Sequence, residues 1–395
     1  MKVLKTCLML SLLYSFTIAD DNLDKFLSNY KIEQFNYDYK KNESQSLQLR
    51  DSWISPVNLS YSYMKSDANN VDVVSKTTSI NLDQPIFRSG GIYSGIKYAK
   101  ASKNYINDSI DISKQKMIKD SLALLIQIKQ IDLKIKKQKL RIKNAKINLA
   151  IKKEQYLNGQ LDSGFLDNAI IEQNTIISAL YDIQTSKERL ISTFQAISDI
   201  DYKNIELPII NFIEKDDFIK NNLLVKMAKN NNLKSDYYKD MSIAKYLPSV
   251  HLVAGYNWNK SEVNSIDTKD DYYNYGLKIT MPLNINTFRD IESSKIESLK
   301  SEVDIKDKKR QLNALYDQVM QNISNIKKKI NLSKDNKVIY MKLLEDTKEL
   351  YEAGYKTEYD VELLSNSFKM QDLDIKILLL DNDLELLNLY ESYKK

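Results

Sequence analysis

The chain has few of the residues from which enzymatic and cross-linked sites are built. Among 395 residues it has one histidine, His251, and one cysteine, Cys7. Residues 1–19 have the basic start, short apolar run and small-residue end of a secretory signal peptide, whose removal would leave no cysteine. Disulfides and thiolate metal sites are therefore excluded from the mature chain. Because there is only one histidine, we expect no Ser-His-Asp triad, no metal, no cofactor and no catalytic residue.

Glycine and proline are also scarce, with 8 and 5 residues, which favours long uninterrupted helices. The glycine cluster at residues 89–95 lacks the Gly-Lys-Ser/Thr ending of a phosphate-binding loop. No run of 18 consecutive apolar residues follows residue 19, so no transmembrane helix is predicted. The 58 basic residues are nearly matched by 53 acidic ones, so the excess positive charge of a nucleic-acid-binding protein is absent. We therefore predict no enzyme and no nucleic-acid partner.

One pattern of landmarks occurs twice. Pro56, Pro85 and Gly159 recur as Pro248, Pro282 and Gly354, at separations of 192, 197 and 195 residues. Separations this long indicate a duplicated half-molecule rather than a solenoid, so we expect two repeats, 20–207 and 208–395. The expected strands span about 53–64, 75–87, 248–259 and 272–283, and the expected helices about 22–50, 88–155, 164–196, 216–245, 289–353 and 358–393.

The expected strands alternate between apolar and polar residues. In the first of them Leu59, Tyr61 and Tyr63 share one face, and asparagine and serine occupy the other. An apolar face opposite a polar one is typical of a lipid-facing barrel around an aqueous lumen. Four strands leave two edges whose backbone groups a bilayer cannot satisfy, so we expect three copies to share a twelve-stranded barrel within a lipid bilayer. The alternative is a two-hairpin sheet packed on the helices of a soluble protein.

The long helix expected at 88–155 has apolar residues on two sides. One stripe contains residues 128, 131, 135, 142, 145 and 149, with Gln138 as its polar member, and the other contains residues 126, 133, 140 and 147. An ordinary two-stranded coiled coil needs one stripe, so two stripes indicate a neighbouring helix on each side. The wall of an α-helical barrel meets this requirement. A plain coiled coil or four-helix bundle explains single stripes but not the strands.

Four motifs lie where these strands and helices are expected to meet or end. They are Tyr246-Leu247-Pro248-Ser249-Val250, Asp83-Gln84-Pro85-Ile86-Phe87-Arg88-Ser89-Gly90-Gly91, Tyr156-x-x-Gly159 and Tyr351-x-x-Gly354-x-x-Thr357-x-x-Asp360. With these motifs, nearly the whole mature chain resembles the TolC-type outer-membrane efflux factors. The resemblance implies an α+β membrane protein in which a trimeric 12-stranded β-barrel is continued by a long, coiled-coil-like α-helical barrel.

The resemblance also implies a location and partners. The chain would be in the cell outer membrane with a long periplasmic extension. It would act as the passive exit duct of a tripartite efflux or type I secretion system, in contact with a periplasmic adaptor protein and an inner-membrane RND, ABC or MFS-type pump. The alternative function is a periplasmic coiled-coil scaffold or stalk without channel activity. A membrane-fusion adaptor would need a β module between its helices, where this chain has short turns at 156–164 and 354–359.

Candidate site residues follow from the same resemblance. The periplasmic-gate candidates are Asp360, Glu362 and Asp167; the tip and adaptor-docking candidates are Tyr156, Gly159, Tyr351, Gly354 and Thr357; the strand-helix junction candidates are Pro85, Gly90, Gly91, Pro248 and Pro282. A local role is also open for the gate, because Thr357 or Asp360 could cap the last helix. The chain departs from the family at Asn284-Ile285-Asn286, which replaces a glycine pair, and at Leu363, where a second acid is common.

Overall fold

The computed structural model describes residues 23–68, 71–263 and 266–394. The expected signal peptide at 1–19, with Cys7, lies outside the described residues. Within the described ranges, no helix combines the length and the apolar character needed to cross a lipid bilayer.

The order of elements in the first half recurs in the second half. In each half a helix is followed by two strands, a very long helix and a shorter helix. The helices are α1 (Asn29–Arg50), α2 (Gly91–Leu157), α3 (Ser163–Gln195), α4 (Lys215–Lys220), α5 (Leu223–Ala244), α6 (Thr287–Glu352) and α7 (Glu358–Leu387), with 3-10 turns at Leu23–Phe26 and Asn388–Glu391. The strands are β1 (Asn58–Ala68), β2 (Val71–Phe87), β3 (Ser249–Val263) and β4 (Ile266–Thr280).

The strand bounds differ from the expected ones at both ends. β1 begins at Asn58 rather than near residue 53, because the Gln84 side chain accepts from Ser55 N at 2.9 Å and donates to Trp53 O at 3.2 Å. This contact holds the preceding residues outside the ladder. At the other end, the polar residues after Lys65 and before residue 272 continue the pairing. Backbone hydrogen bonds do not depend on side-chain polarity, so alternation alone misplaces these ends.

The helix expected at 216–245 is divided into α4 and α5. The break lies at Asn221 and Asn222, and the buried Asn222 side chain donates to Ser392 Oγ at 3.0 Å. Asn222 also forms an isolated backbone bridge with Tyr393. The C-terminal segment therefore fixes this break, which local sequence does not indicate. The same segment ends α7 at Leu387 and continues as a 3-10 turn rather than as helix to residue 393.

The described chain forms two compact units. The sheet unit comprises Asn36–Asp111 and Leu223–Arg310, and the hairpin unit comprises Ile112–Asn222, Gln311–Lys395 and the residues up to Phe35. Each unit contains segments from both halves of the sequence, because α2 and α6 run through both units.

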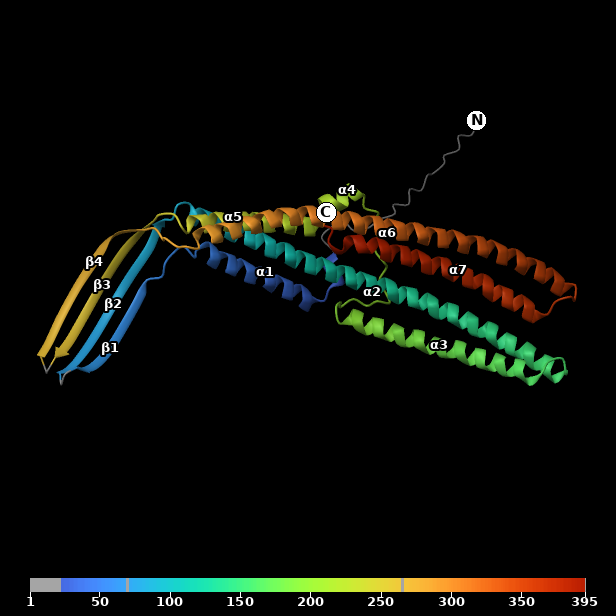
Figure 1. Cartoon of the computed structure of the whole chain (residues 1–395). Coiled ribbons are helices and arrows are strands. Elements are labelled where there is room, and N and C mark those ends of the chain that lie inside the picture. The colour runs from blue at the N-terminus through green and yellow to red at the C-terminus, as the bar shows by residue number, and fades with distance from the viewer. Residues whose placement is uncertain (1–22, 69–70, 264–265, 395) are drawn as a thin grey trace, which may run out of the picture. The chain divides into compact units, whose positions relative to one another are not determined.

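In the sheet unit the four strands form one antiparallel sheet in the order β1-β2-β3-β4 (Figure 1). The attached helical segments follow the same order. Asn42 of α1 donates to Asn107 Oδ1 of α2 at 2.8 Å, Asn230 of α5 donates to Asp108 Oδ2 of α2 at 2.5 Å, and Asn232 of α5 donates to Ser301 Oγ of α6 at 3.0 Å. Polar side chains thus join each helix of this unit to the next.

In the hairpin unit, α2 lies between α3 and α7 (Figure 1). Gln138 of α2 donates to Ile176 O of α3 at 2.8 Å, and Gln130 of α2 donates to Asp381 Oδ1 of α7 at 2.6 Å. The sequence prediction of a neighbour on each side of this helix is confirmed within one chain. Buried Phe26, Phe194, Phe218 and Leu389 form part of the core that supports the hairpins.

Candidate functional site

One face of the sheet is apolar and exposed. The ladder register places Leu59 opposite Ile80, Ile80 opposite Tyr256, and Tyr256 opposite Tyr273, so apolar residues from all four strands share this face. On the two outer strands, the side chains of Leu59 and Tyr275 are 72% and 80% exposed. A contiguous exposed apolar face marks a surface that another apolar phase covers.

The opposite face is polar and hydrogen-bonded across the strands. Ser60 Oγ and Ser79 Oγ are 2.7 Å apart, and Asn81 donates to Ser79 Oγ at 3.0 Å. Gly255 lies between Asn81 and Asn274, where an added Cβ would approach their side-chain oxygens to 2.8 and 2.5 Å. Glycine at this position therefore leaves room for two asparagine side chains on the polar face.

A group of five residues, the Asp83 cluster, lies at the base of the polar face. It consists of Asp83, Ser249, His251, Lys278 and Thr280 from β2, β3 and β4. His251 Nδ1 is 2.6 Å from Asp83 Oδ1, and Lys278 pairs with the other oxygen of Asp83. His251 Nε2 is 3.1 Å from Ser249 Oγ, which is itself 2.8 Å from Thr280 Oγ1.

The cluster corrects one expectation from the sequence. A Ser-His-Asp constellation was not expected, yet the strand register brings Ser249, His251 and Asp83 together in that order. Acyl transfer would also need free backbone N–H donors beside the serine to stabilise the oxyanion. β3 is paired with β2 and β4 from Val250 onward, so its N–H groups there belong to the ladder. The geometry gives a hydrogen-bond network without this catalytic element.

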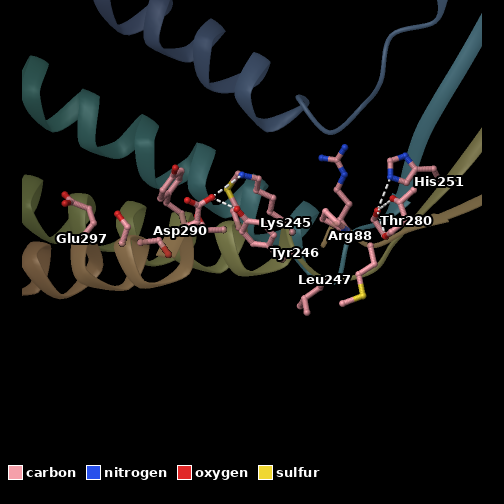
Figure 2. Close-up of a pocket in the computed structure, with 18 residues that line it drawn as sticks. Arg88, Lys245, Tyr246, Leu247, His251, Thr280, Asp290 and Glu297 are labelled. Atoms are coloured by element: carbon pink, nitrogen blue, oxygen red, sulfur yellow. Dashed lines mark hydrogen bonds and ion pairs between the residues drawn. The ribbon is translucent and has the colours of Figure 1, made fainter. Parts of the chain in front are cut away.

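A pocket of about 880 Å³ adjoins the Asp83 cluster at the junction of β3 and β4 with α5 and α6 (Figure 2). Ser249, His251 and Thr280 line it. Further charged lining residues are Arg88, Lys245, Asp290 and Glu297. Tyr246 donates to Asp290, and Lys245 Nζ lies 3.6 Å from Asp290 Oδ2. The pocket therefore contains charges of both signs, largely neutralised within the wall.

The two strand-helix junctions are built differently. In the first, Ser89 and Gly90 have φ values of 44° and 86°, in the left-handed region that glycine adopts readily. Gly91 approaches α5 so closely that an added Cβ would lie 3.1 Å from Ala244 Cβ. The Ser89 hydroxyl donates to Pro248 O at 2.6 Å, which ties the start of α2 to the start of β3.

The second junction uses asparagine where the first uses glycine. Asn284 Oδ1 accepts from Asn286 N at 2.8 Å, and Asn284 O accepts from the Thr287 hydroxyl at 2.6 Å. This Asx-type turn begins α6 without a left-handed residue. Pro85 lies at a register shift between β2 and β3, and Pro282 follows the end of β4. Any functional role of the junction prolines and glycines stays a prediction.

The two hairpin tips share one geometry. Gly159 and Gly354 have φ values of 70° and 79°. Gln160 N donates to Gln155 O and Tyr355 N donates to Leu350 O, each at 2.8 Å, which gives both helix ends the Schellman pattern. The expected left-handed glycines are confirmed. The assignment of these tips, with Tyr156, Tyr351 and Thr357, to adaptor docking stays a prediction.

Asp360 belongs to a capping box at the start of α7. Thr357 Oγ1 accepts from Asp360 N at 3.3 Å, and Asp360 Oδ2 accepts from Thr357 N at 3.0 Å. The backbone N–H and the hydroxyl of Thr357 both donate to Asp360 Oδ2, and they hold the pKa of Asp360 below its usual value. The capping role is therefore seen, with Thr357 as the N-cap. In α3 the equivalent cap is Asp162, which accepts from Gly164 N at 2.8 Å and was not predicted.

The other two gate candidates lie apart from this capping box. Asp167 is exposed on α3, five residues after its N-cap, and Glu362 is exposed on the first turns of α7. No role in gating follows from these positions alone, so the gate assignment of Asp360, Glu362 and Asp167 stays a prediction.

A polar ladder joins α2 to α7. Asn366 Nδ2 donates to Asn144 Oδ1 at 2.8 Å, Lys137 Nζ lies 2.5 Å from Asp374 Oδ1, and Gln130 donates to Asp381 Oδ1 at 2.6 Å. Residues 130, 137 and 144 alternate along α2 with the apolar stripe at 126, 133, 140 and 147. This seam is therefore a heptad repeat with one apolar and one polar layer. The sequence predicted only the apolar layer of this seam.

Within the described ranges, no group of three or more histidine, cysteine, aspartate and glutamate side chains is arranged to hold a metal ion.

Comparisons with known proteins give similarity in structure only. No family model matches the sequence, and no curated protein matches it. The solved structure of the outer membrane protein VceC from Vibrio cholerae is similar with a TM-score of 0.72 and 13% identity, over 94% of this chain and 96% of that one. CusC, described in connection with transmembrane channel formation, has a TM-score of 0.71 and 13% identity, over 93% and 90%.

The outer membrane channel CmeC of Campylobacter jejuni is similar with a TM-score of 0.70 and 13% identity, over 95% of this chain and 87% of that one. All three are outer-membrane channels of the TolC family. The resemblance found from the four sequence motifs is thereby confirmed for the fold, and this chain has the TolC-type outer-membrane efflux channel fold.

Proposed function

We propose that the chain is one protomer of a homotrimeric outer-membrane duct that conducts solutes passively. The observation that carries the proposal is the sheet: over the described residues β1 and β4 each pair on one side, and the sheet has one exposed apolar face. In lipid, every backbone N–H and C=O needs a partner. Pairing β4 of one copy with β1 of the next satisfies both edges, and threefold closure gives a twelve-stranded barrel.

The outer helices of the hairpin unit support the same closure. The order α3-α2-α7-α6 follows from the Gln138 and Gln130 contacts and from Lys337 of α6, whose Nζ lies 2.8 Å from Asp372 Oδ1 of α7. α3 and α6 are therefore the two ends of this row. Both have exposed apolar side chains, among them Tyr181 at 63% and Val338 at 62%. Contact between α6 of one copy and α3 of the next would cover these residues and close a helical barrel.

The likeness in fold to outer-membrane channels supports a proposal about partners. A duct of this fold would receive solutes from a periplasmic adaptor and an inner-membrane pump of the RND, ABC or MFS type. The hairpin tips around Gly159 and Gly354 would be the docking surface for the adaptor. Export energy would come from the pump, because the proposed duct is a passive conductor.

Cysteine cross-linking tests the trimer, and conductance tests the duct. The expected mature chain has no cysteine, so Tyr61→Cys on β1 and Leu277→Cys on β4 would be its only thiols. A flexible bis-maleimide should link copies of the double variant into dimers and trimers on denaturing gels, while each single variant stays monomeric. Ile80→Cys with Leu277→Cys is the matched control, because β2 is an inner strand.

Conductance in planar bilayers completes the test. Purified protein should need detergent, migrate as a heat-sensitive trimer and give stepwise single-channel currents. A protein that is monomeric without detergent and gives no current would refute the duct and favour the periplasmic scaffold.

A further inference from the structure

We propose that His251 makes the charge selectivity of the duct depend on pH, so that acid favours anions. The inference rests on the proposed function, because it requires the polar face of the sheet to line a water-filled lumen. The carrying observation is the Asp83 cluster, in which one imidazole is held among charged groups from three strands.

The hydrogen bonds define how a proton would be added to His251. An ionised carboxylate only accepts hydrogen bonds, so His251 Nδ1 donates to Asp83 Oδ1. In the neutral imidazole, Nε2 then accepts from the Ser249 hydroxyl. On protonation Nε2–H becomes a donor, and the Ser249 hydroxyl turns to donate to Thr280 Oγ1, 2.8 Å away. Both charge states of the ring therefore have complete partners, without a change of strand register.

The surrounding charges cancel when the imidazole is neutral. On the strands that flank β3, Asp83 is negative and Lys278 is positive. The adjoining pocket adds Arg88 at the start of α2 and Lys245 after α5, both positive, and Asp290 and Glu297 on α6, both negative. Three positive groups thus face three negative groups. Protonation of His251 would add one positive charge to this group in each protomer, and threefold symmetry would repeat it around the lumen.

His251 is the imidazole of the Asp83 cluster. Histidine is the side chain whose ordinary pKa lies between pH 5 and 8, and this chain has one histidine. Its side chain is 16% exposed, so the added charge lies at the wall of the lumen rather than in bulk water. Charges on a concave wall concentrate ions of opposite sign. Between pH 8 and pH 5.5, chloride should therefore gain over potassium.

The test is the reversal potential of the reconstituted trimer in a KCl gradient. From pH 8 to pH 5.5, the chloride-to-potassium permeability ratio of the wild-type channel should rise about twofold to fivefold. His251→Asn should remove this rise, and His251→Lys should give the acid-like ratio at both pH values. Asn257→His places a histidine on the same polar face of β3 but away from the Asp83 cluster. In the His251→Asn background it tests whether any histidine on this face suffices.

The outcomes separate the two proposals. Stepwise currents whose selectivity is the same at pH 8 and pH 5.5 would overturn the role of His251 and leave the duct intact. A pH shift that persists in His251→Asn would also overturn it. Absence of any current would refute the duct and this inference together. Modification of the single histidine of the wild-type channel with diethylpyrocarbonate should abolish the shift, so a variant that fails to fold does not decide the result.

Discussion

Breaking the Lys137–Asp374 pair should open the proposed duct at its periplasmic end. The pair joins α2 to α7 with an N–O distance of 2.5 Å, and the two side chains are 23% and 27% exposed. For a partly exposed pair, removal costs about 1 kcal/mol. A homotrimer has three copies, so Asp374→Lys should weaken the closed arrangement by about 3 kcal/mol. Because 1.4 kcal/mol is a factor of ten, the ratio of open to closed channels should rise about a hundredfold.

The assay is the open probability of single channels in planar bilayers at fixed voltage. Asp374→Lys should raise it, and Lys137→Asp combined with Asp374→Lys should restore the closed state by reforming the pair in reverse. Lys139→Glu is the matched control, because Lys139 is exposed on the same helix, two residues from Lys137. An unchanged open probability in Asp374→Lys, or a double variant that stays as open as the single one, would refute the assignment of this seam to closure.

Four further predictions concern the tips and the C-terminal segment. Thr357→Ala should loosen the start of α7 by about 1 kcal/mol, seen as faster amide exchange at residues 357–361. Because the pKa of Asp360 is lowered from 3.8 in the folded state, the contribution of the cap to stability should be present above that pH and be lost as pH falls below it. If the gate role holds, Asp360→Ala should in addition raise the conductance of the channel or remove its block by divalent cations. Tyr393 donates to Asp217 Oδ2 at 2.5 Å, and burial together with this hydrogen bond raises the pKa of Tyr393 from 10.0 to about 12. The contribution of Tyr393 to stability should therefore be complete below pH 10 and disappear towards pH 12. In denaturation experiments, Tyr393→Phe should lower the free energy of unfolding by about 1 kcal/mol at neutral pH and make its decrease at alkaline pH less steep. A Cβ added at Gly354 would meet no atom within 4 Å, but Gly354→Ala forces alanine into the left-handed backbone conformation at a cost of about 1 kcal/mol. Export should therefore fall while the yield of trimer is unchanged. If the variant binds the adaptor as well as the wild type does, the tip is excluded as a docking surface.

The parts of the fold that follow from local periodicity could be predicted. Alternation in the strands gave the apolar face, and the ladder register shows that Leu59, Ile80 and Tyr256 share it. Two stripes on the long helix gave its two neighbours. The glycines that end α2 and α6 have the expected left-handed backbone. In each case the signal is contained within a few turns or one strand.

Features that depend on distant residues could not be predicted. The Asp83 cluster requires Asp83 and His251 to meet across 168 residues, which only the register of β2 against β3 determines. The break at Asn222 depends on Ser392, 170 residues later. The polar ladder could not be predicted from the sequence, because lysine and glutamine on a helix are typical of solvent-exposed positions. Only the structure gives their partners on α7. Single-sequence periodicity describes which face is buried, not which polar groups meet there.

The two seams of α2 differ in what their separation would expose. The seam towards α3 has two polar contacts: the buried Gln138, which is bonded to a backbone carbonyl, and the Asp132–Lys187 ion pair, whose N–O distance is 2.7 Å. The other residues of the α2 stripe that faces α3 are apolar. Opening it would expose apolar surface, at about 25 cal/mol for each Å². The seam towards α7 has a polar group at every second layer, and these groups can exchange their partners for water at small net cost. The α2–α7 seam is therefore the one that should separate when the proposed duct opens, with α2 and α3 moving as one hairpin. Replacing the polar layer with leucine at residues 130, 137 and 144 and at their α7 partners should lock the duct closed, whereas the same change at Gln138 should leave gating unaffected.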